Sequence, residues 1–371
     1  MMIGKSLQRQ VWRKSPCWIR SFALKNLLAF PLRSLNVLVT SECNLRCKFC
    51  NIGSSSYKAR SHDTNLTLEN YRKSLFSGKQ HDHIGHVHLS GGEPFLRLDL
   101  IDICDLFALH CPNADISIAT NGVLTERIVT FGELLQSRDY RRRLSIGISM
   151  DGLGELHDSI RGGKGIFNRV NETIREVARR FPGFLKNLSF TVIPENAHQL
   201  AIVFKEAQDK GLELYFRIAA ESPVYYGDNR GSLQQWDQSK LEELDHTIKQ
   251  IFSIPVRGIN GFDIRMIFFK HMCRAYTIKK RNFDCFAGLC SVFIDHEGNI
   301  RPCIWLDCVL GNIAHDSLPD VLRSQRAREI RRYISRRECF CWTECETLNS
   351  WSTAEWLGMP IRDYLKVYDQ A

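Results

Sequence analysis

The cysteines of this chain fall into two groups whose spacing suits metal chemistry. Three of them, Cys43, Cys47 and Cys50, form the pattern C-x3-C-x2-C directly after a run of apolar residues. Structural zinc and iron–sulfur cubes normally take four protein ligands, so three thiolates leave one position open for another molecule. The spacing therefore predicts a reactive metal centre. The alternative is a zinc loop completed by a distant histidine such as His62.

A second group of seven cysteines lies between residues 285 and 345, whereas residues 112 to 272 contain none. Residues 297–299 read as a hairpin turn that brings Cys285 close to Cys303. The expected ligands of a second centre are Cys285, Cys303, Cys341 and Cys345, with Cys290 and Cys339 as substitutes. Zinc on the same thiolates is the alternative. No secretion signal precedes these residues, so the fourteen cysteines indicate metal binding rather than disulfides.

The segments that must position these cysteines alternate between two patterns. Apolar runs typical of strands lie at 35–40, 86–89, 116–119, 144–150, 188–192 and 214–218. Amphipathic patterns predict helices at 68–76, 100–109, 167–180, 197–210 and 240–252. Six strand and helix units predict an α/β fold around a parallel sheet, either open or barrel-like.

Conspicuous loops follow the expected strands. The first carries the three cysteines, the second reads Gly91-Gly92-Glu93-Pro94, and the third and fourth contain Asn121 and Asp151. In α/β folds the loops after the carboxyl ends of strands meet at one rim, where ligands bind. The cysteine loop and the Gly-Gly-Glu-Pro loop are therefore expected to lie side by side.

Composition limits the classes of protein to consider. The chain has 371 residues, of which 44% are hydrophobic and 25% are charged, as in globular proteins of one or two domains. Its net charge of +9 comes partly from basic runs at 141–143 and 326–337. Nucleic-acid binding is one interpretation of these runs. We favour a solvated helix face, because Ile330 and Ile334 recur at helical spacing, and we expect no nucleic-acid partner.

No stretch of 18 apolar residues occurs, and the first residues lack a clean apolar region of a secretion signal. The expected location is therefore cytoplasmic. Residues 1–34 form an N-terminal extension with the pattern of a basic amphipathic helix. We favour packing of this helix on the rest of the protein over peripheral contact with a membrane.

The motif C-x3-C-x-aromatic-C at residues 43–50, together with Gly91-Gly92-Glu93-Pro94, resembles the signature of the radical S-adenosylmethionine (SAM) superfamily. The resemblance implies a partial (β/α)6 TIM-like barrel over residues 35–255. It also implies a [4Fe–4S] cluster held by Cys43, Cys47 and Cys50, with SAM chelating the fourth iron. The residues it implies for SAM binding are Phe49, Gly91, Gly92, Glu93, Pro94, Asn121, Ser149 and Asp151.

The later run Cys285-x12-Gly298-x4-Cys303 resembles the SPASM and twitch domains of the same superfamily. This implies an auxiliary domain over residues 256–350 with one auxiliary [4Fe–4S] cluster, followed by a C-terminal tail at 351–371. The segment Ser149-Met150-Asp151-Gly152, followed by His157-Asp158 and Arg161-Gly162-Gly163, resembles the branch of the superfamily that carries extra clusters. The alternative for His157 is a purely structural role.

The resemblance implies that a one-electron reductant such as flavodoxin or ferredoxin starts the reaction. SAM is then cleaved to methionine and a 5′-deoxyadenosyl radical, which abstracts hydrogen from a substrate, and the auxiliary cluster binds substrate or removes an electron. Only 42 residues precede Cys43, too few for a peptide-leader domain, so we expect a sugar, nucleoside, lipid precursor or other metabolite as substrate. The residues expected near it are Glu195, Arg217, Glu221, Tyr225 and Tyr226, and the alternative for these five is exposed loop positions without a role.

Two other functions stay open. The first is a radical SAM maturase that modifies a peptide or protein. The second, from a different class, is a non-catalytic zinc or iron–sulfur binding protein. The Gly91-Gly92-Glu93-Pro94 loop at a strand end argues against the second, because a simple metal-binding protein would not need it.

Overall fold

A computed structural model describes residues 32–52, 65–76, 81–219, 222, 236–253, 264–281 and 283–356. Most of the expected N-terminal extension lies outside these residues. The same holds for four residues considered above, namely His62, Glu221, Tyr225 and Tyr226. The expectations for them stay predictions.

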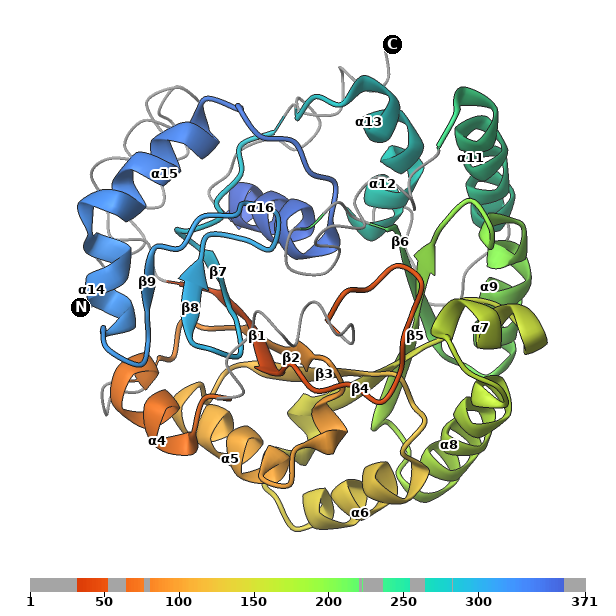
Figure 1. The fold of residues 1–371 in the computed structure, drawn as a ribbon, viewed down its shortest axis with the longest axis horizontal. Helices are drawn as coiled ribbons and strands as arrows, with labels where there is room; N and C mark the ends of the chain where they lie inside the picture. Colours follow the sequence, from red (N-terminus) through yellow and green to blue (C-terminus); the bar gives the residue numbers. More distant parts are fainter. Residues whose placement is uncertain are drawn as a thin grey trace.

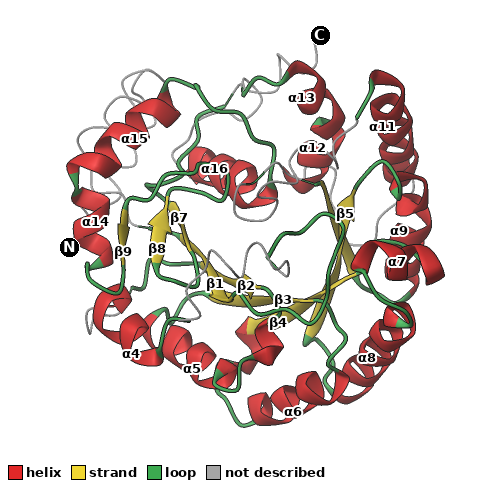
Figure 2. Ribbon diagram, in the orientation of Figure 1, coloured by secondary structure: helices red, strands yellow, loops and turns green. Residues whose placement is uncertain are grey.

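A nine-stranded sheet curves through the centre of the protein (Figures 1 and 2). Its strand order is β6-β5-β4-β3-β2-β1-β7-β8-β9. The strands of the first part are β1 (Ser34–Thr40), β2 (His86–Gly91), β3 (Asp115–Thr120), β4 (Leu144–Ser149), β5 (Leu185–Val192) and β6 (Glu213–Ile218). All neighbours among them are parallel, so their carboxyl ends share one edge. The sheet is an open arc rather than a closed barrel, and each of its first six strands overlaps an apolar run expected from the sequence.

Helices cover the outer side of this arc, and the last two before the C-terminal strands lie at its open side (Figure 1). In chain order they are α4 (Leu68–Asn70), the π-helix Tyr71–Phe76, α5 (Leu100–His110), α6 (Thr125–Gln136), α7 (Gly154–Arg161), α8 (Ile166–Arg180), α9 (Leu200–Asp209), α11 (Gln238–Ser253), α12 (Ile264–Lys270) and α13 (Met272–Ile278). Short 3-10 turns lie at Pro94–Leu96, Arg141–Arg143 and Ala197–Gln199. The buried faces of helices and strands form one large apolar core. The fold is therefore the expected α/β arrangement.

The C-terminal strands continue the same sheet. Strand β7 (Ser291–Ile294) pairs in parallel with β1, and it pairs antiparallel with β8 (Asn299–Arg301), which is followed by β9 (Gly311–Asn312). The hairpin expected around residues 297–299 is confirmed. Because β1 is bordered by β2 on one side and β7 on the other, it is a central strand, and all seven of its residues are buried.

Three helices complete the C-terminal part: α14 (Leu318–Arg323), α15 (Gln325–Ser335) and α16 (Glu344–Trp356). Helices α14 and α15 lie outside the β8 and β9 edge, whereas α16 lies on the inner side of the arc (Figure 1). Packed aromatic rings hold α16 there. The fully buried rings of Trp342 and Trp351 lie 5.5 Å apart, and Trp342 Nε1 donates to the carbonyl of Phe268 at 3.0 Å. Helix α16 spans residues on both sides of the expected boundary at 350/351.

Candidate functional site

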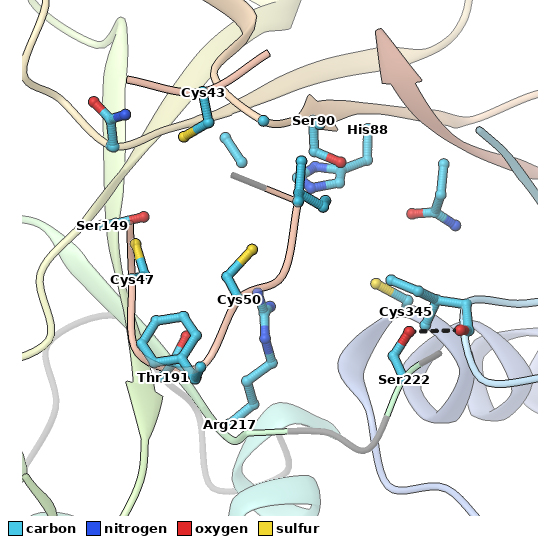
Figure 3. Close-up of a pocket in the computed structure, with 18 of the residues that line it drawn as sticks. Cys43, Cys47, Cys50, His88, Ser90, Ser149, Thr191, Arg217, Ser222 and Cys345 are labelled. Atoms are coloured by element: carbon cyan, nitrogen blue, oxygen red, sulfur yellow. Dashed lines mark hydrogen bonds between the residues drawn. The ribbon is translucent and has the colours of Figure 1, made fainter. Parts of the chain in front are cut away.

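A cavity of about 180 Å³ lies at the carboxyl ends of the parallel strands. Its lining comes from the loop after β1, from all six parallel strands of the arc, from β7 and from the start of α16. Figure 3 shows the sulfur atoms of Cys43, Cys47 and Cys50 directed toward a common space, with Cys345 facing that space from α16. The three cysteines of the first motif are therefore brought together on one wall, as the sequence predicts.

The loop after β2 contacts the cysteine loop directly. The amide of Gly92 donates to Thr40 O at 2.8 Å, and the amide of Glu93 donates to Glu42 O at 2.7 Å. A Cβ atom on Gly92 would come within 1.9 Å of Glu42 O, and one on Gly91 within 2.3 Å of Thr40 O. Both glycines line the cavity, but their missing side chains admit the backbone of the cysteine loop. The expected adjacency of the two loops is confirmed.

Glu93 lies behind the cavity wall rather than in it. Its carboxylate is fully buried and accepts hydrogen bonds from Thr120 Oγ1 at 2.8 Å, from the Asn121 amide at 2.7 Å and from the Phe95 amide at 3.1 Å. Burial raises the pKa of Glu93 to about 7, although these three donors favour the ionised form. The carboxylate therefore joins the loops after β2 and β3. Pro94 likewise lies outside the lining, whereas Asn121 is part of it.

Arg161, at the end of α7, links several of these residues. Its guanidinium lies 2.5 Å from a carboxylate oxygen of Asp151, donates to Cys47 Sγ at 3.7 Å and lies over the Phe49 ring at 5.4 Å. Asp151 is fully buried and is also held by the Thr191 amide at 2.7 Å. A buried cation beside sulfur favours negative charge on the cysteine loop. Phe49 lines the cavity, and Asp151 acts on it only through Arg161.

His157 lies in the interior, away from the cavity lining. Its Nδ1 accepts a hydrogen bond from the Asp151 amide at 3.1 Å, and its ring packs on Phe167. Burial lowers the pKa of His157 to about 3, so the ring is neutral near pH 7. These contacts fit the structural alternative for this histidine.

Burial also sets the protonation of the first cysteine group. It raises the pKa of Cys43 to about 11 and that of Cys50 to about 12, and it raises the pKa of Cys47 despite the nearby Arg161. Without a metal the three groups are neutral thiols near pH 7. Metal ligation requires thiolates, so loading the site must release protons.

A second, smaller pocket of about 60 Å³ contains four cysteines of the C-terminal group. They are Cys285, Cys303, Cys339 and Cys341, and burial raises the pKa of Cys285 to about 11. Arg281 lies beside them and donates to Cys339 Sγ at 3.8 Å. Four thiols in one pocket with an adjacent cation match the donor set of an iron–sulfur cube.

Two of the cysteines considered for this second centre lie elsewhere. Cys345, in the first turn of α16, lines the larger cavity instead of the smaller pocket. Cys290 is buried and lies outside the lining of both. Cys339, expected only as a substitute, lines the smaller pocket together with Cys341. Glu346 lines both spaces.

Polar groups that sequence reasoning did not select also face the larger cavity. Asn36 on β1 and Thr343 before α16 are 6% and 4% exposed, and neither Asn36 Nδ2 nor Thr343 Oγ1 has a hydrogen-bond partner among the described residues. His88 on β2 stands opposite Asn36 in the strand register and lines the same wall. A polar residue inside an apolar strand run was the available signal for Asn36 and His88.

Of the residues expected near the substrate, the structure describes Arg217 and Glu195, and only Arg217 lines the cavity. Arg217 on β6 lines the cavity and lies 3.7 Å from Glu344 of α16. Ser222 also lines it and donates to Ile304 O at 2.7 Å. Glu195 lies outside the lining, where its carboxylate pairs with Lys48 of the cysteine loop at 2.8 Å. Glu195 therefore anchors the loop from outside.

Two further properties concern the part of the chain that the structure describes. In that part of the chain, no three His, Cys, Asp or Glu side chains lie close enough together to hold a single metal ion. Among the described helices, none is both long enough and apolar enough to cross a membrane.

Comparison with protein families finds two matches. Residues 37–207 match the radical SAM superfamily, and residues 285–346 match SPASM, an iron–sulfur cluster-binding domain. The first match contains the cysteine loop and the Gly91-Gly92 loop. The second begins at Cys285 and ends just after Cys345.

Individual relatives are distant. The antilisterial bacteriocin subtilosin biosynthesis protein AlbA of Bacillus subtilis is 24% identical over 77% of this chain and 58% of its own length. Pre-heme d1 synthase of Dinoroseobacter shibae is 29% identical over 56% of this chain and 46% of its own length. The chain thus spans about half the length of these two relatives. The crystal structure of Streptococcus suis SuiB bound to S-adenosylmethionine has a TM-score of 0.60 at 17% identity, covering 83% of this chain and 69% of SuiB.

Proposed function

The chain belongs to the radical SAM superfamily and carries a SPASM domain, and from this premise we propose that it cleaves SAM reductively and directs hydrogen abstraction from a small polar substrate. The family expected from the motifs is confirmed, and the two matches support SAM and [4Fe–4S] clusters as its cofactors. The division into a core at 35–255 and an auxiliary part at 256–350 remains a proposal.

The first cluster site would consist of Cys43, Cys47 and Cys50. Three inward thiols on one loop leave the fourth iron of a cube without a protein ligand, as SAM chelation requires. When bound there, the reduced cluster and SAM supply a 5′-deoxyadenosyl radical. The loop itself contributes position and charge. Arg161 beside Cys47 offsets the negative charge of thiolates, and the Lys48–Glu195 pair fixes the outer side of the loop.

SAM would lie along the wall formed by the loops after β2, β3 and β4. Gly91 and Gly92 present backbone groups there, Asn121 and Ser149 present polar side chains, and Phe49 presents a ring. Glu93, Pro94 and Asp151 would support SAM binding from behind this wall. The buried Glu93 carboxylate holds the loop that carries Asn121, and Asp151 holds Arg161. In this proposal Glu93, Pro94 and Asp151 are positioning residues.

The auxiliary cluster would be held by Cys285, Cys303, Cys339 and Cys341. The observation that supports this set is their presence in one pocket beside Arg281. Cys345 is left out because it faces the larger cavity, and Cys290 because it faces neither space. Compared with the ligands expected from spacing, Cys339 takes the place of Cys345.

The substrate would occupy the part of the larger cavity between β1 and α16. The observation that carries this proposal is the pair of buried groups without partners among the described residues, Asn36 Nδ2 and Thr343 Oγ1, which both line that space. Leaving a buried polar group unpaired costs about 1–3 kcal/mol, so a ligand that completes both hydrogen bonds recovers this free energy. A small molecule with adjacent acceptor and donor groups fits this requirement. The walls around it would exclude water from a reactive radical.

A second candidate is modification of a peptide. Its support is the similarity to AlbA, a bacteriocin biosynthesis protein. A peptide side chain bearing an amide or hydroxyl group could make the same contacts with Asn36 and Thr343. Comparison of SAM cleavage in the presence of metabolite pools and of peptide pools separates the two substrate classes.

The central experiment measures iron and SAM cleavage together. The protein is purified anaerobically, reconstituted with iron and sulfide, and assayed for 5′-deoxyadenosine formed with dithionite. Two cubes correspond to about eight irons per chain, and the variant Cys43→Ala/Cys47→Ala/Cys50→Ala should lose about four of them and all 5′-deoxyadenosine. Cys308→Ser, at a cysteine outside both pockets, is the matched control and should keep both.

Either of two results would overturn the proposal. One is stoichiometric zinc in place of iron with no 5′-deoxyadenosine, which would favour a binding protein. The other is undiminished 5′-deoxyadenosine formation by the triple variant, because it would remove the reaction from the three-cysteine loop.

A further inference from the structure

Helix α15 carries a concentrated positive charge on its outer side. From residue 324 to residue 338 the chain contains six arginines and two glutamates. Arg326, Arg328 and Arg332 are exposed, and none of the three forms an ion pair within the described part of the chain. The positive charge of arginines on a solvated helix face is commonly balanced by acidic neighbours. On α8, for example, Arg179 pairs with Glu176 at 2.8 Å. The one acidic residue of α15, Glu329, accepts a hydrogen bond from Gln325 Nε2 at 2.9 Å and forms no ion pair with these three arginines.

The inner side of the same helix covers the pocket proposed for the auxiliary cluster. Ile334 is buried and lines that pocket, and Ile330 packs in the same apolar cluster as Cys285 and Cys303. Arg331, one residue from the exposed Arg332, turns inward and donates to Gly288 O at 3.2 Å, which fixes the helix on the loop that starts at Cys285. Only one helix, about 10 Å in diameter, therefore separates the basic surface from the cysteines.

The two surfaces also meet at the end of the helix. Helix α15 ends at Ser335, and Arg336 and Arg337 follow it before Cys339, which lies in the pocket and is partly exposed. The carbonyl of Ile334 accepts a hydrogen bond from Arg281, the residue that contacts Cys339 Sγ. Arg336 pairs with Glu338 at 3.7 Å and Arg337 with Asp284 at 3.6 Å. Between residues 324 and 338, the described arginines without an ion pair are therefore those on the helix beside the pocket, whereas Arg336 and Arg337 at its rim are paired.

We propose that the outer face of α15, defined by Arg326, Arg328 and Arg332, is the docking surface for an acidic one-electron carrier protein. This inference rests on the proposed function, because it takes the cysteine pocket as the site of a cluster that exchanges electrons. Opposite charges steer such encounters and orient the partner, and a partner on α15 faces the pocket. The position beside the pocket favours an electron carrier over nucleic acid or an anionic membrane, for which this location has no purpose.

The test compares two charge-reversal variants. The first is Arg326→Glu/Arg328→Glu/Arg332→Glu on α15. The second is Arg141→Glu/Arg142→Glu/Arg175→Glu, which makes the same change in net charge at exposed arginines of the Arg141–Arg143 turn and α8. Binding of an acidic flavodoxin with oxidised flavin is measured by calorimetry at low and at high salt. Iron content and 5′-deoxyadenosine formation with dithionite are measured in parallel.

The α15 variant should weaken flavodoxin binding about 10-fold or more and reduce the salt dependence of binding, whereas the control variant should stay close to the wild type. Both variants should keep their iron and dithionite-driven 5′-deoxyadenosine within about twofold, because dithionite needs no docking surface.

Three outcomes would overturn the proposal. Equal loss of flavodoxin binding in the two variants would do so, since net charge would then explain it. Unchanged binding in the α15 variant would also overturn it, as would loss of RNA or anionic vesicle binding in its place. Failure of the proposed function itself is distinguished by absent 5′-deoxyadenosine in the wild type.

Discussion

The guanidinium of Arg161 contacts both the buried carboxylate of Asp151, at 2.5 Å, and the sulfur of the partly buried Cys47, at 3.7 Å. Asp151 comes from the loop after β4, and Cys47 from the loop after β1. Arg161 is the last residue of α7. One side chain therefore connects three segments of the chain, and it places a positive charge where the first cluster is proposed.

Replacement of Arg161 tests this connection. Arg161→Met leaves the Asp151 carboxylate buried without its cation, which should lower the free energy of unfolding by about 3–5 kcal/mol. The double variant Arg161→Met/Asp151→Asn should recover a large part of this loss, because the amide oxygen of the new side chain still accepts from the Thr191 amide. Denaturant unfolding measures both. Arg138→Met is the control, since its half-exposed pair with Asp105 should contribute about 1 kcal/mol or less. Equal losses at Arg161 and Arg138 would contradict the prediction.

Gly92 is expected to tolerate no side chain. In Gly92→Ala the new Cβ would overlap Glu42 O, so the cysteine loop and the loop after β2 must move apart. Overpacking of this kind costs about 1–3 kcal/mol, and the displaced loop should also fail to hold about four irons after reconstitution. Gly85→Ala is the matched control, because a Cβ there would meet no described atom within 4 Å. A Gly92→Ala protein with full iron content would show that the contact of the two loops is dispensable.

Single replacements distinguish the cysteines of the C-terminal group. Cys339→Ala should remove about four irons per chain, because it takes one ligand from the four-cysteine pocket. Cys345→Ala and Cys290→Ala should keep about eight irons. Iron analysis and visible absorption of the reconstituted proteins measure the difference. Loss of iron in Cys345→Ala with retention of iron in Cys339→Ala would contradict this prediction and support the ligand set expected from sequence spacing.

The titration of Glu93 should lower the free energy of unfolding as pH rises. Its pKa rises from 4.5 in the unfolded chain to about 7 in the folded protein, because of burial. The folded state therefore holds this proton more tightly, so the stabilisation is complete below pH 4.5 and is lost as pH rises through 7. The loss amounts to up to about 3 kcal/mol.

Glu93→Gln removes this titration. The unfolding free energies of wild type and variant, measured between about pH 5 and pH 8, should be similar at the lower pH, where Glu93 is a neutral carboxyl like the amide of the variant. The wild-type value should then fall below that of the variant as pH rises, because only the wild type must bury a charge at this position. Thr120→Val serves as a control, since it removes one donor to the carboxylate without removing the titrating group. Parallel curves for wild type and Glu93→Gln would contradict the raised pKa.

The fold could largely be predicted from periodicity, because the first six strands carry buried apolar residues that read as apolar runs. Helix α6 escaped prediction, since Gly132 interrupts its pattern. In the structure a Cβ at Gly132 would lie 2.5 Å from the Phe181 ring, so tertiary packing explains this glycine. The meeting of the cysteine loop with Gly91 and Gly92 was also predictable, because parallel strands place their carboxyl ends together.

The grouping of the C-terminal cysteines could not be predicted from their spacing in the sequence. Spacing along the chain grouped Cys341 with Cys345, four residues apart. The structure separates them because α16 begins at Glu344, so that Cys345 takes a direction set by the helix while Cys341 lies in the segment before it. The position of the helix start depends on the burial of Trp342 and Trp351, whose contacts with Phe283 are long-range. Asn36 and His88 stand out as polar residues inside apolar strand runs, but only the curvature of the folded sheet shows that their strand face lines a cavity.

The pairing of β7 with β1 has a consequence for how the chain folds and how it can be divided. An exposed edge of a strand offers unpaired amide and carbonyl groups to other chains and promotes aggregation. A fragment that ends before residue 285 would uncover that edge on β1, the strand leading into the cysteine loop. The N-terminal strands and the C-terminal hairpin are therefore expected to unfold as one cooperative unit, and production of the core alone would require a substitute for β7.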